Sequence, residues 1–200
     1  EDKTETVSLN AGTNIVAVKY DTGDTGGVNL DRILVSPTAV VPAASETNLL
    51  DNPGFECNTA FNSNWTEWHP GGQALAYGID SGKGTNPPEA PSTGWQRAYF
   101  YAPGAYKQSI HQEVAVPVNN ANYRFEARVR LSNTAPTTAR AEISNHGGSA
   151  QYYNISNDGV WKTIRIDNIY VTSGVVDVGF YVDSPGGTTL HIDDVRLTQQ

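Results

Sequence analysis

The sequence predicts an all-β fold, a two-sheet antiparallel β-sandwich, with an extra short β segment at the N-terminus. From residue 48 onward no apolar pattern of helical period appears. Short apolar stretches are instead separated by clusters of Asn, Gly, Pro and Asp, as is typical of sandwich strands and their turns. The clearest alternation is 123–130, Tyr-Arg-Phe-Glu-Ala-Arg-Val-Arg, in which four apolar residues face the core and four charged ones face outward.

The first 36 residues form a separate unit in this prediction. Residues 4–35 show the pattern of short strands and turns, and end in the apolar stretch 28–35. Because three strands cannot close a sandwich, residues 1–36 are expected to be the remnant of a truncated domain or to pack on another part of the protein. Residues 37–47 hold prolines and small residues without a usable period, which predicts a linker. The sandwich itself is expected over residues 48–200.

Nine strands are expected within the sandwich, each bounded by turn-forming residues. Successive side chains of a strand point to opposite sides, so each strand should bury one row of side chains and present the other. The predicted strands cover 74–79, 97–101, 106–116, 123–131, 140–144, 150–155, 161–171, 175–182 and 190–197.

The composition limits the chain to one good core and argues against anionic polymers as partners. With 200 residues and 38% hydrophobic content, the chain can bury one full domain but hardly two. Its formal charge of −8 would repel nucleic acid and anionic membranes, and no apolar run approaches the length of a membrane span. Cys57 is the only cysteine, which excludes an intramolecular disulfide and a thiolate metal cluster.

Two adjacent acids interrupt the last predicted strand. Alternation sends Ile192 and Asp194 to one side, and His191 and Asp193 to the other, so one carboxylate is expected to point inward. A buried carboxylate needs a partner, and a hard cation would serve. Because Ile192 should itself be buried, either a bulge resets the alternation or the roles of the two acids are exchanged.

Short motifs occur in order along residues 48–198: Asn-Leu-Leu at 48–50, Asn-Pro-Gly-Phe-Glu at 52–56, Trp-Thr-Glu-Trp at 65–68, Gln-Glu-Val at 112–114, Trp161, and Ile-Asp-Asp-Val at 192–195. Together they resemble the jelly-roll carbohydrate-binding modules of families 4, 9, 16 and 22, and the resemblance implies a jelly roll. Separately, residues 4–36 resemble the last strands of a family 6 or 35 module. Most of such a module would be missing here, so its binding site would be incomplete.

The resemblance also implies a structural calcium ion. In such modules the first and last strands lie close together and commonly hold the metal with an acid from each end. Carried over by position, this implicates Glu56 and Asp193, with Asp194 and Asp51 as weaker candidates and backbone carbonyl groups completing the shell. The alternative is that these acids are ordinary solvated side chains.

Sugar recognition requires flat apolar ring faces, and four tryptophans are candidates to supply them. Trp68 and Trp95 lie in loop-rich stretches, where an exposed ring is unusual without a ligand. Trp65 and Trp161 are expected to pack in the core, since tryptophan commonly anchors a sandwich. The sequence therefore predicts Trp68 and Trp95 as stacking residues.

Sugar recognition also requires planar polar groups that pair with hydroxyls. In the family implied here the cleft crosses one sheet, so outward residues of its central strands become candidates. The predicted set places Tyr181 beside Arg128 and Glu142, and includes Glu126, Arg140 and Gln112. For any one of the charged residues, an ordinary cross-strand ion pair is the alternative.

These patterns predict a non-catalytic polysaccharide-binding module of a secreted, multimodular glycoside-active enzyme, with a catalytic domain in the same polypeptide. A neutral glycan of the β-glucan or xylan type is favoured. One alternative is a glycoside hydrolase with Glu126 and Glu142 as its carboxylate pair, or a jelly-roll polysaccharide lyase using Arg128, His111 and Gln112. Another alternative is a structural spacer or adhesion module without a sugar site.

Overall fold

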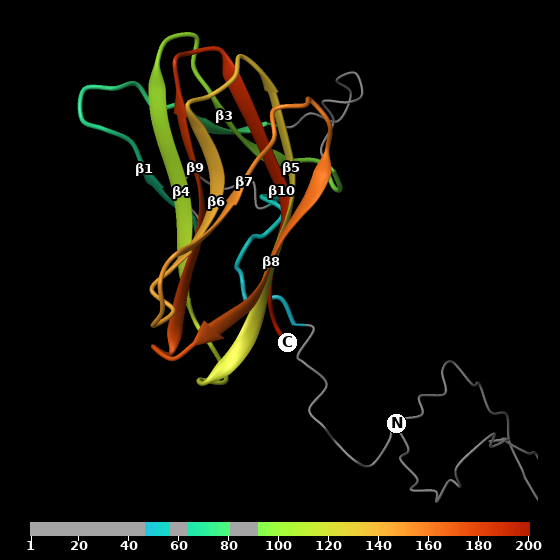
Figure 1. Ribbon diagram of the computed structural model, residues 1–200. Coiled ribbons are helices and arrows are strands. Elements are labelled where there is room, and N and C mark those ends of the chain that lie inside the picture. Colours follow the sequence, from blue (N-terminus) through green and yellow to red (C-terminus); the bar gives the residue numbers. More distant parts are fainter. Residues whose placement is uncertain (1–46, 57–63, 81–91) are drawn as a thin grey trace, which may run out of the picture. The chain divides into compact units, whose positions relative to one another are not determined.

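The structure is a computed structural model that describes residues 47–56, 64–80 and 92–200 (Figure 1). The predicted N-terminal remnant, linker residues 37–46 and Cys57 lie outside this part of the chain. Within the described ranges all regular secondary structure is β-strand, and the strands form two antiparallel sheets of five. No helix capable of crossing a membrane occurs among the described residues. The predicted all-β sandwich is confirmed.

The two sheets exchange strands along the chain. Sheet A has the order β1 (Thr66–Trp68), β4 (Tyr106–Ala115), β9 (Val175–Ser184), β6 (Thr138–Ser144) and β7 (Gln151–Asn154). Sheet B has the order β2 (Tyr77–Asp80), β3 (Arg97–Tyr101), β10 (Thr188–Gln199), β5 (Ala121–Asn133) and β8 (Lys162–Val171). Sequential strands repeatedly cross from one sheet to the other, as in a jelly roll, and Figure 1 shows the two layers facing each other.

All nine predicted strands are present, with boundaries that differ by a few residues. The predicted alternation in β5 is confirmed, since Tyr123, Phe125, Ala127 and Val129 are buried in the core. The tenth strand, β1, is three residues long and was not predicted, because three residues are too few to show a period of two.

Within the core, a set of aromatic rings joins the two sheets. Phe180 of β9 lies 6.5 Å from Trp65 and 5.8 Å from Phe125 of β5, measured between ring centroids. Trp65 in turn lies 5.4 Å from Phe55. All four rings are buried, so Trp65 packs in the core as predicted. Phe180 therefore connects sheet A to sheet B.

The last strand, β10, is central to sheet B and contains a bulge. Asp193 pairs with Arg128, whereas the next register position pairs Arg196 with Glu126, so β10 holds one extra residue between them. Asp194 has a φ of 49°, in the left-handed region. Ile192 and Val195 consequently both reach the core, although alternation alone would separate them. The bulge that would reset the alternation is thus present.

Residues at the start of the module lie beside the end of β10. Leu49 N donates to Leu197 O at 2.9 Å, and the Asn48 side chain bonds both Val195 O at 2.9 Å and Leu197 N at 3.0 Å. The Asn-Leu-Leu motif at 48–50 and the closing strand are therefore neighbours, as the resemblance implies.

Replacing Phe180 by alanine should lower the free energy of unfolding by about 3 to 5 kcal/mol, because the buried ring would leave a cavity between the sheets. Urea unfolding followed by tryptophan fluorescence measures this loss. Val160→Ala, at an exposed position, serves as the control and should change stability by less than about 0.5 kcal/mol. Equal effects of the two substitutions would contradict the central place of Phe180 in the core.

Candidate functional site

The outer face of sheet A carries two rows of aligned side chains. Cross-strand pairing places Trp68 of β1, Ser109 of β4, Tyr181 of β9 and Arg140 of β6 in one row. A parallel row joins four further residues and a glycine, and we call both rows together the sheet A platform. The second row is Thr66, His111, Gly179, Glu142 and Tyr152.

The aromatic rings of the sheet A platform are spread across its whole width. Trp68 is 50% exposed on one edge strand, and Tyr152 is 53% exposed on the other. Tyr181 lies between them on the central strand β9 and is half-buried. Since neighbouring strands lie about 4.8 Å apart, the two edge strands are separated by about 19 Å. The rings can therefore contact successive parts of one extended ligand.

Arg140 fixes the polar part of the sheet A platform. Its guanidinium lies 4.3 Å from the ring centroid of Tyr152 and 5.4 Å from that of Tyr181. Its Nε donates to Glu142 Oε1 at 2.5 Å, which holds the guanidinium and the carboxylate side by side. A planar donor group and a planar acceptor group thus lie between two aromatic rings, where they can bond adjacent hydroxyls.

Gly179 leaves the second row of the sheet A platform without a side chain at its central strand. A Cβ atom added there would lie 2.6 Å from the carbonyl oxygen of Ile110 and 2.9 Å from the Cβ of His111, so no side chain fits. His111 on the neighbouring strand is held by Asp177, with Nδ1 3.0 Å from Oδ1. The second row of the platform therefore has no side chain at its centre, between His111 and Glu142.

The four acids proposed as calcium ligands separate into two kinds. Glu56 and Asp193 flank Gly54, since a Cβ atom added to this glycine would lie 3.6 Å from Glu56 Cγ and 3.7 Å from Asp193 Oδ1. Asp194 instead bonds the Thr93 hydroxyl at 2.5 Å, and Asp51 accepts from the Asn64 amide at 3.2 Å.

Glu56 and Asp193 also hold the segment that leads into β3. Glu56 Oε1 accepts from Trp95 N and Gln96 N at 2.8 and 3.0 Å. Asp193 Oδ2 accepts from Ser92 N and Thr93 N at 2.8 and 3.1 Å. No group of three or more His, Cys, Asp or Glu side chains suited to a metal occurs among the described residues, so a calcium here would depend on backbone oxygens as well.

Comparison with known proteins gives one long match in sequence. No family model matches the chain. It is 64% identical over all 200 residues to a protein of Sporosarcina globispora named 1,6-alpha-glucosyltransferase. The chain spans only 16% of the length of that protein.

Comparison with solved structures concerns the sandwich. TmCBM61, solved in complex with β-1,4-galactotriose, matches with a TM-score of 0.64 and 24% identity over 77% of this chain and 99% of that one. A family 16 carbohydrate-binding module matches with a TM-score of 0.50 and 16% identity over 75% of this chain and 99% of that one. The enzymatically active domain of tailspike protein 4 of bacteriophage CBA120 matches with a TM-score of 0.59 and 18% identity, over 76% of this chain and 21% of that one.

The chain has the jelly-roll fold of carbohydrate-binding modules. The fold alone does not locate a ligand, so the module's candidate residues must be judged by where the structure places them.

The structure brings together half of the residues predicted to bind sugar. Trp68, Tyr181, Arg140 and Glu142 all lie on the sheet A platform. Tyr152 also lies there and was missed, because a four-residue strand gives no clear indication of which side chain faces outward. The tandem tyrosines at 152 and 153 were the available signal.

The other predicted residues lie elsewhere in the module. Glu126 and Arg128 are on β5 of sheet B, so the predicted placement of Tyr181 beside Arg128 is wrong. Gln112 points inward, where it accepts from Asp51 N at 2.8 Å and donates to Asn64 O at 2.8 Å. Trp95, 61% exposed, precedes β3 of sheet B. Alternation predicts which residues of a strand share a side, but not which sheet the strand joins.

Trp161 is not a core residue, contrary to the prediction. It is only half-buried and stacks on His191 of β10, with ring centroids 6.1 Å apart and an angle of 27° between the planes. Burial, together with the nearby Arg97 and Arg130, lowers the pKa of His191 to about 3, so its imidazole is neutral near pH 7. The outer face of sheet B therefore carries a half-buried aromatic ring over buried polar side chains.

His191 should make the module lose stability in acid. Its pKa is depressed from 6.5 in the unfolded chain to about 3 in the fold, so the unfolded chain binds the extra proton and stability falls as pH drops from about 6.5 towards 3. Burial raises the pKa of Asp193 to about 6, which acts in the opposite direction between pH 6 and 4. The test is therefore the difference in unfolding free energy between wild type and His191→Gln across this range, in which the Asp193 contribution cancels. The difference should move in favour of the variant as pH falls, and parallel curves would contradict the assignment.

Proposed function

We propose that the chain is a non-catalytic polysaccharide-binding module and that the sheet A platform holds a neutral glycan chain. The observation that supports this most directly is the distribution of Trp68, Tyr181 and Tyr152 over β1, β9 and β7 of one sheet face, with the Arg140–Glu142 pair on β6 between the last two strands. Sugar rings stack their C–H faces on aromatic side chains, and adjacent hydroxyls pair with guanidinium and carboxylate groups. The glycan would cross the strands.

The placement of the acids supports a binding role over the hydrolase alternative. Catalytic carboxylates of glycosidases must lie within about 5 to 10 Å of each other. Glu142 points outward from sheet A and Glu126 points outward from sheet B. Because packed sheets are themselves about 10 Å apart, two side chains on opposite outer faces cannot flank one glycosidic bond.

The lyase alternative requires Arg128, His111 and Gln112 to meet. His111 lies on the outer face of sheet A, Gln112 points into the sandwich, and Arg128 belongs to sheet B. The three side chains thus point in three different directions. The spacer alternative predicts no sugar binding and is decided by the experiment below.

The choice of glycans to test follows from the comparisons. The TmCBM61 structure contains β-1,4-galactotriose, and the relative from Sporosarcina globispora is named for α-1,6-glucosyl transfer. Galactan and α-glucans therefore belong beside the β-glucan and xylan favoured from the sequence. The attachment to a catalytic domain in the same polypeptide is part of the proposal, and secretion of the protein stays a prediction.

We propose in addition that Glu56 and Asp193 are the carboxylate ligands of a structural calcium ion. Asp193 is fully buried, and no ion pair with it is found in the described part of the chain. Burial of a carboxylate without a cation costs free energy, which the raised pKa of Asp193 reflects. A bound calcium would favour the charged carboxylate and would fasten the segment before β3 to the bulge of β10.

Affinity electrophoresis of the full chain should show retardation by at least one neutral polysaccharide among xylan, mixed-linkage β-glucan, galactan, dextran and starch. Trp68→Ala and Tyr181→Ala should each weaken that binding by about tenfold or more, because each removes a stacking ring. Tyr170→Ala is the matched control, since Tyr170 is 49% exposed but lies on β8 of sheet B. Absence of retardation on every polymer would overturn the proposal in favour of the spacer, and new reducing ends or unsaturated products would favour an enzyme.

Chelation should destabilise the module if calcium is bound. Adding EDTA is expected to lower the melting temperature by several degrees, because a ligand that binds only the folded state is removed. Glu56→Gln should lose this response, whereas Asp51→Asn, whose carboxylate faces Asn64, should keep it. An unchanged midpoint of the wild type, measured by scanning calorimetry with and without EDTA, would reject the calcium site.

A further inference from the structure

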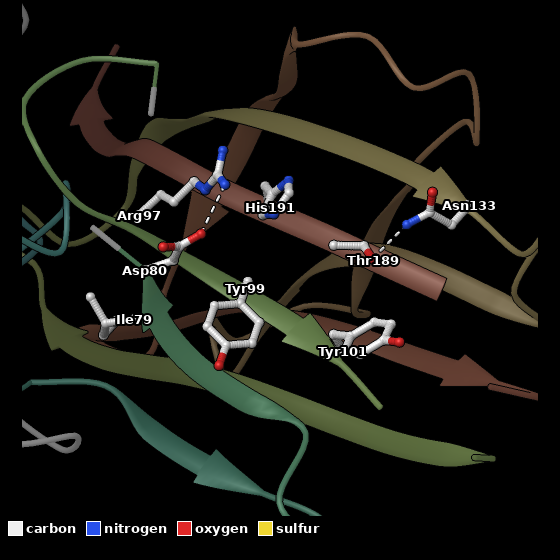
Figure 2. Close-up of a pocket in the computed structure, with 8 residues that line it drawn as sticks. All are labelled: Ile79, Asp80, Arg97, Tyr99, Tyr101, Asn133, Thr189 and His191. Carbon is white, nitrogen blue, oxygen red and sulfur yellow. Dashed lines mark hydrogen bonds and ion pairs between the residues drawn. The ribbon is translucent and has the colours of Figure 1, made fainter. Parts of the chain in front are cut away.

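The outer face of sheet B contains a hollow that is separate from the sheet A platform (Figure 2). It has a volume of about 570 Å³ and lies across β2, β3 and β10, reaching the end of β5. This volume is within the usual range of small-molecule sites. We call it the sheet B hollow. Its lining residues are Ile79, Asp80, Arg97, Tyr99, Tyr101, Asn133, Thr189 and His191.

Tyr99 forms the floor of the sheet B hollow. Its cross-strand partner on β2 is Gly78, and a Cβ atom added to this glycine would lie 2.5 to 2.7 Å from atoms of the Tyr99 ring. The ring thus lies flat over the glycine backbone and turns its other face to the hollow. Tyr101, two residues further along the same side of β3, is 45% exposed. The two tyrosines supply flat apolar surface of the kind on which a sugar ring stacks.

Polar groups stand at the two ends of the sheet B hollow, as Figure 2 shows. At one end, Arg97 Nη2 lies 2.9 Å from Asp80 Oδ2. At the other end, Asn133 Nδ2 donates to Thr189 Oγ1 at 2.9 Å, which orders an amide and a hydroxyl side by side. Donors and acceptors at both ends of an aromatic floor match a ring that carries hydroxyls around its edge.

Burial of Arg97 costs free energy, because part of its guanidinium group has no hydrogen-bond partner among the described residues. Arg97 is 2% exposed, and its Nε and Nη1 atoms have no hydrogen-bond partner in the part of the chain that the structure describes. A buried donor without a partner costs free energy, and the cost is larger for a charged group. Such groups are concentrated at functional sites, where a ligand or an ordered water satisfies them.

The lining favours a neutral ligand. The charged residues Arg97 and Asp80 of the lining pair with each other, with 2.9 Å between Nη2 and Oδ2. Apart from His191, the other lining residues are of apolar or neutral polar types. An anionic sugar would therefore find no unpaired cation among the lining residues, whereas a neutral sugar would find hydroxyl partners without desolvating an isolated charge.

We infer that the sheet B hollow is a second saccharide site, which takes one or two neutral sugar units at the end of a glycan. This inference rests on the proposed saccharide-binding function and extends it to the opposite face of the sandwich. The platform holds the middle of a chain, while the hollow, bounded by polar groups at both ends, holds a terminus. One module would then contact two glycan chains at once.

Chemical-shift mapping with the full chain tests this inference, using isomaltotriose, maltotriose and β-1,4-galactotriose as probes. At least one probe should shift amide signals of residues 99–101 and 189–191 as well as those of the sheet A platform. Tyr101→Ala and Thr189→Val should each weaken binding at the hollow by about tenfold, and leave the platform signals responsive. The platform response also confirms that both variants are folded.

The double variant Trp68→Ala/Tyr181→Ala separates the two sites. If the hollow binds sugar, its amide signals should still shift in this variant, and calorimetric titration should fall from two sites per chain to one. Shifts confined to the platform, with no effect of Tyr101→Ala, would overturn the inference that the hollow binds sugar. They would leave the proposed function of the platform intact. Shifts confined to the hollow would support it as a sugar site, and no shift at the hollow with any of the three probes would reject it, while the platform is judged by the electrophoresis described above. Glucuronic acid should bind the hollow more weakly than glucose, and the reverse order would contradict a neutral site.

Discussion

The ring contacts between Phe180, Phe125 and Trp65 are the interaction on which the rest of the module depends. They hold β9 of sheet A against β5 of sheet B, and they fix which side of each strand is buried. Once Phe180 points inward, Gly179 and Tyr181 must point outward, because successive side chains of a strand alternate. The same constraint on β5 places Arg124 and Glu126 on the opposite outer face. The core thus determines two separate polar surfaces.

The bulge in β10 allows the strand to bury apolar residues on its inner side and to keep polar residues on its outer side. With the extra residue, Ile192 and Val195 both fill the core, while His191 and Asp193 remain on the outer side of sheet B. His191 is neutral and stacks with Trp161, and Asp193 holds the segment before β3. The adjacent acids of the closing strand are therefore not equivalent. One is buried against backbone amides, and the other, Asp194, occupies the left-handed position that the bulge requires.

The strands could be predicted well from the sequence and the candidate site only in part, because strand alternation is local and sheet assignment is not. Period-two alternation is a local property, so the nine longer strands and the outward position of Tyr181, Arg140 and Glu142 could be predicted. The assignment of strands to sheets is a long-range property, and without it Arg128 was placed beside Tyr181. Gln112 illustrates a second limit, because its amide serves the backbone of 51 and 64 instead of a ligand. The surroundings of Trp161 and Tyr99 depend on residues distant in sequence, a stacked histidine and a cross-strand glycine, which only the three-dimensional structure reveals.

The central position of β10 has a consequence for how the protein is made. This strand follows all the other described strands in the chain, yet it pairs with both β3 and β5. During synthesis β3 and β5 must each wait for this shared partner with one edge unpaired, and exposed edges are sites of aggregation. Sheet A has the same requirement one strand earlier, because β9 follows β4 and β6 in the chain and pairs with both. Each sheet is thus completed only when its central strand has been synthesised, first β9 and then β10, and until then the edges that will pair with it are open to aggregation.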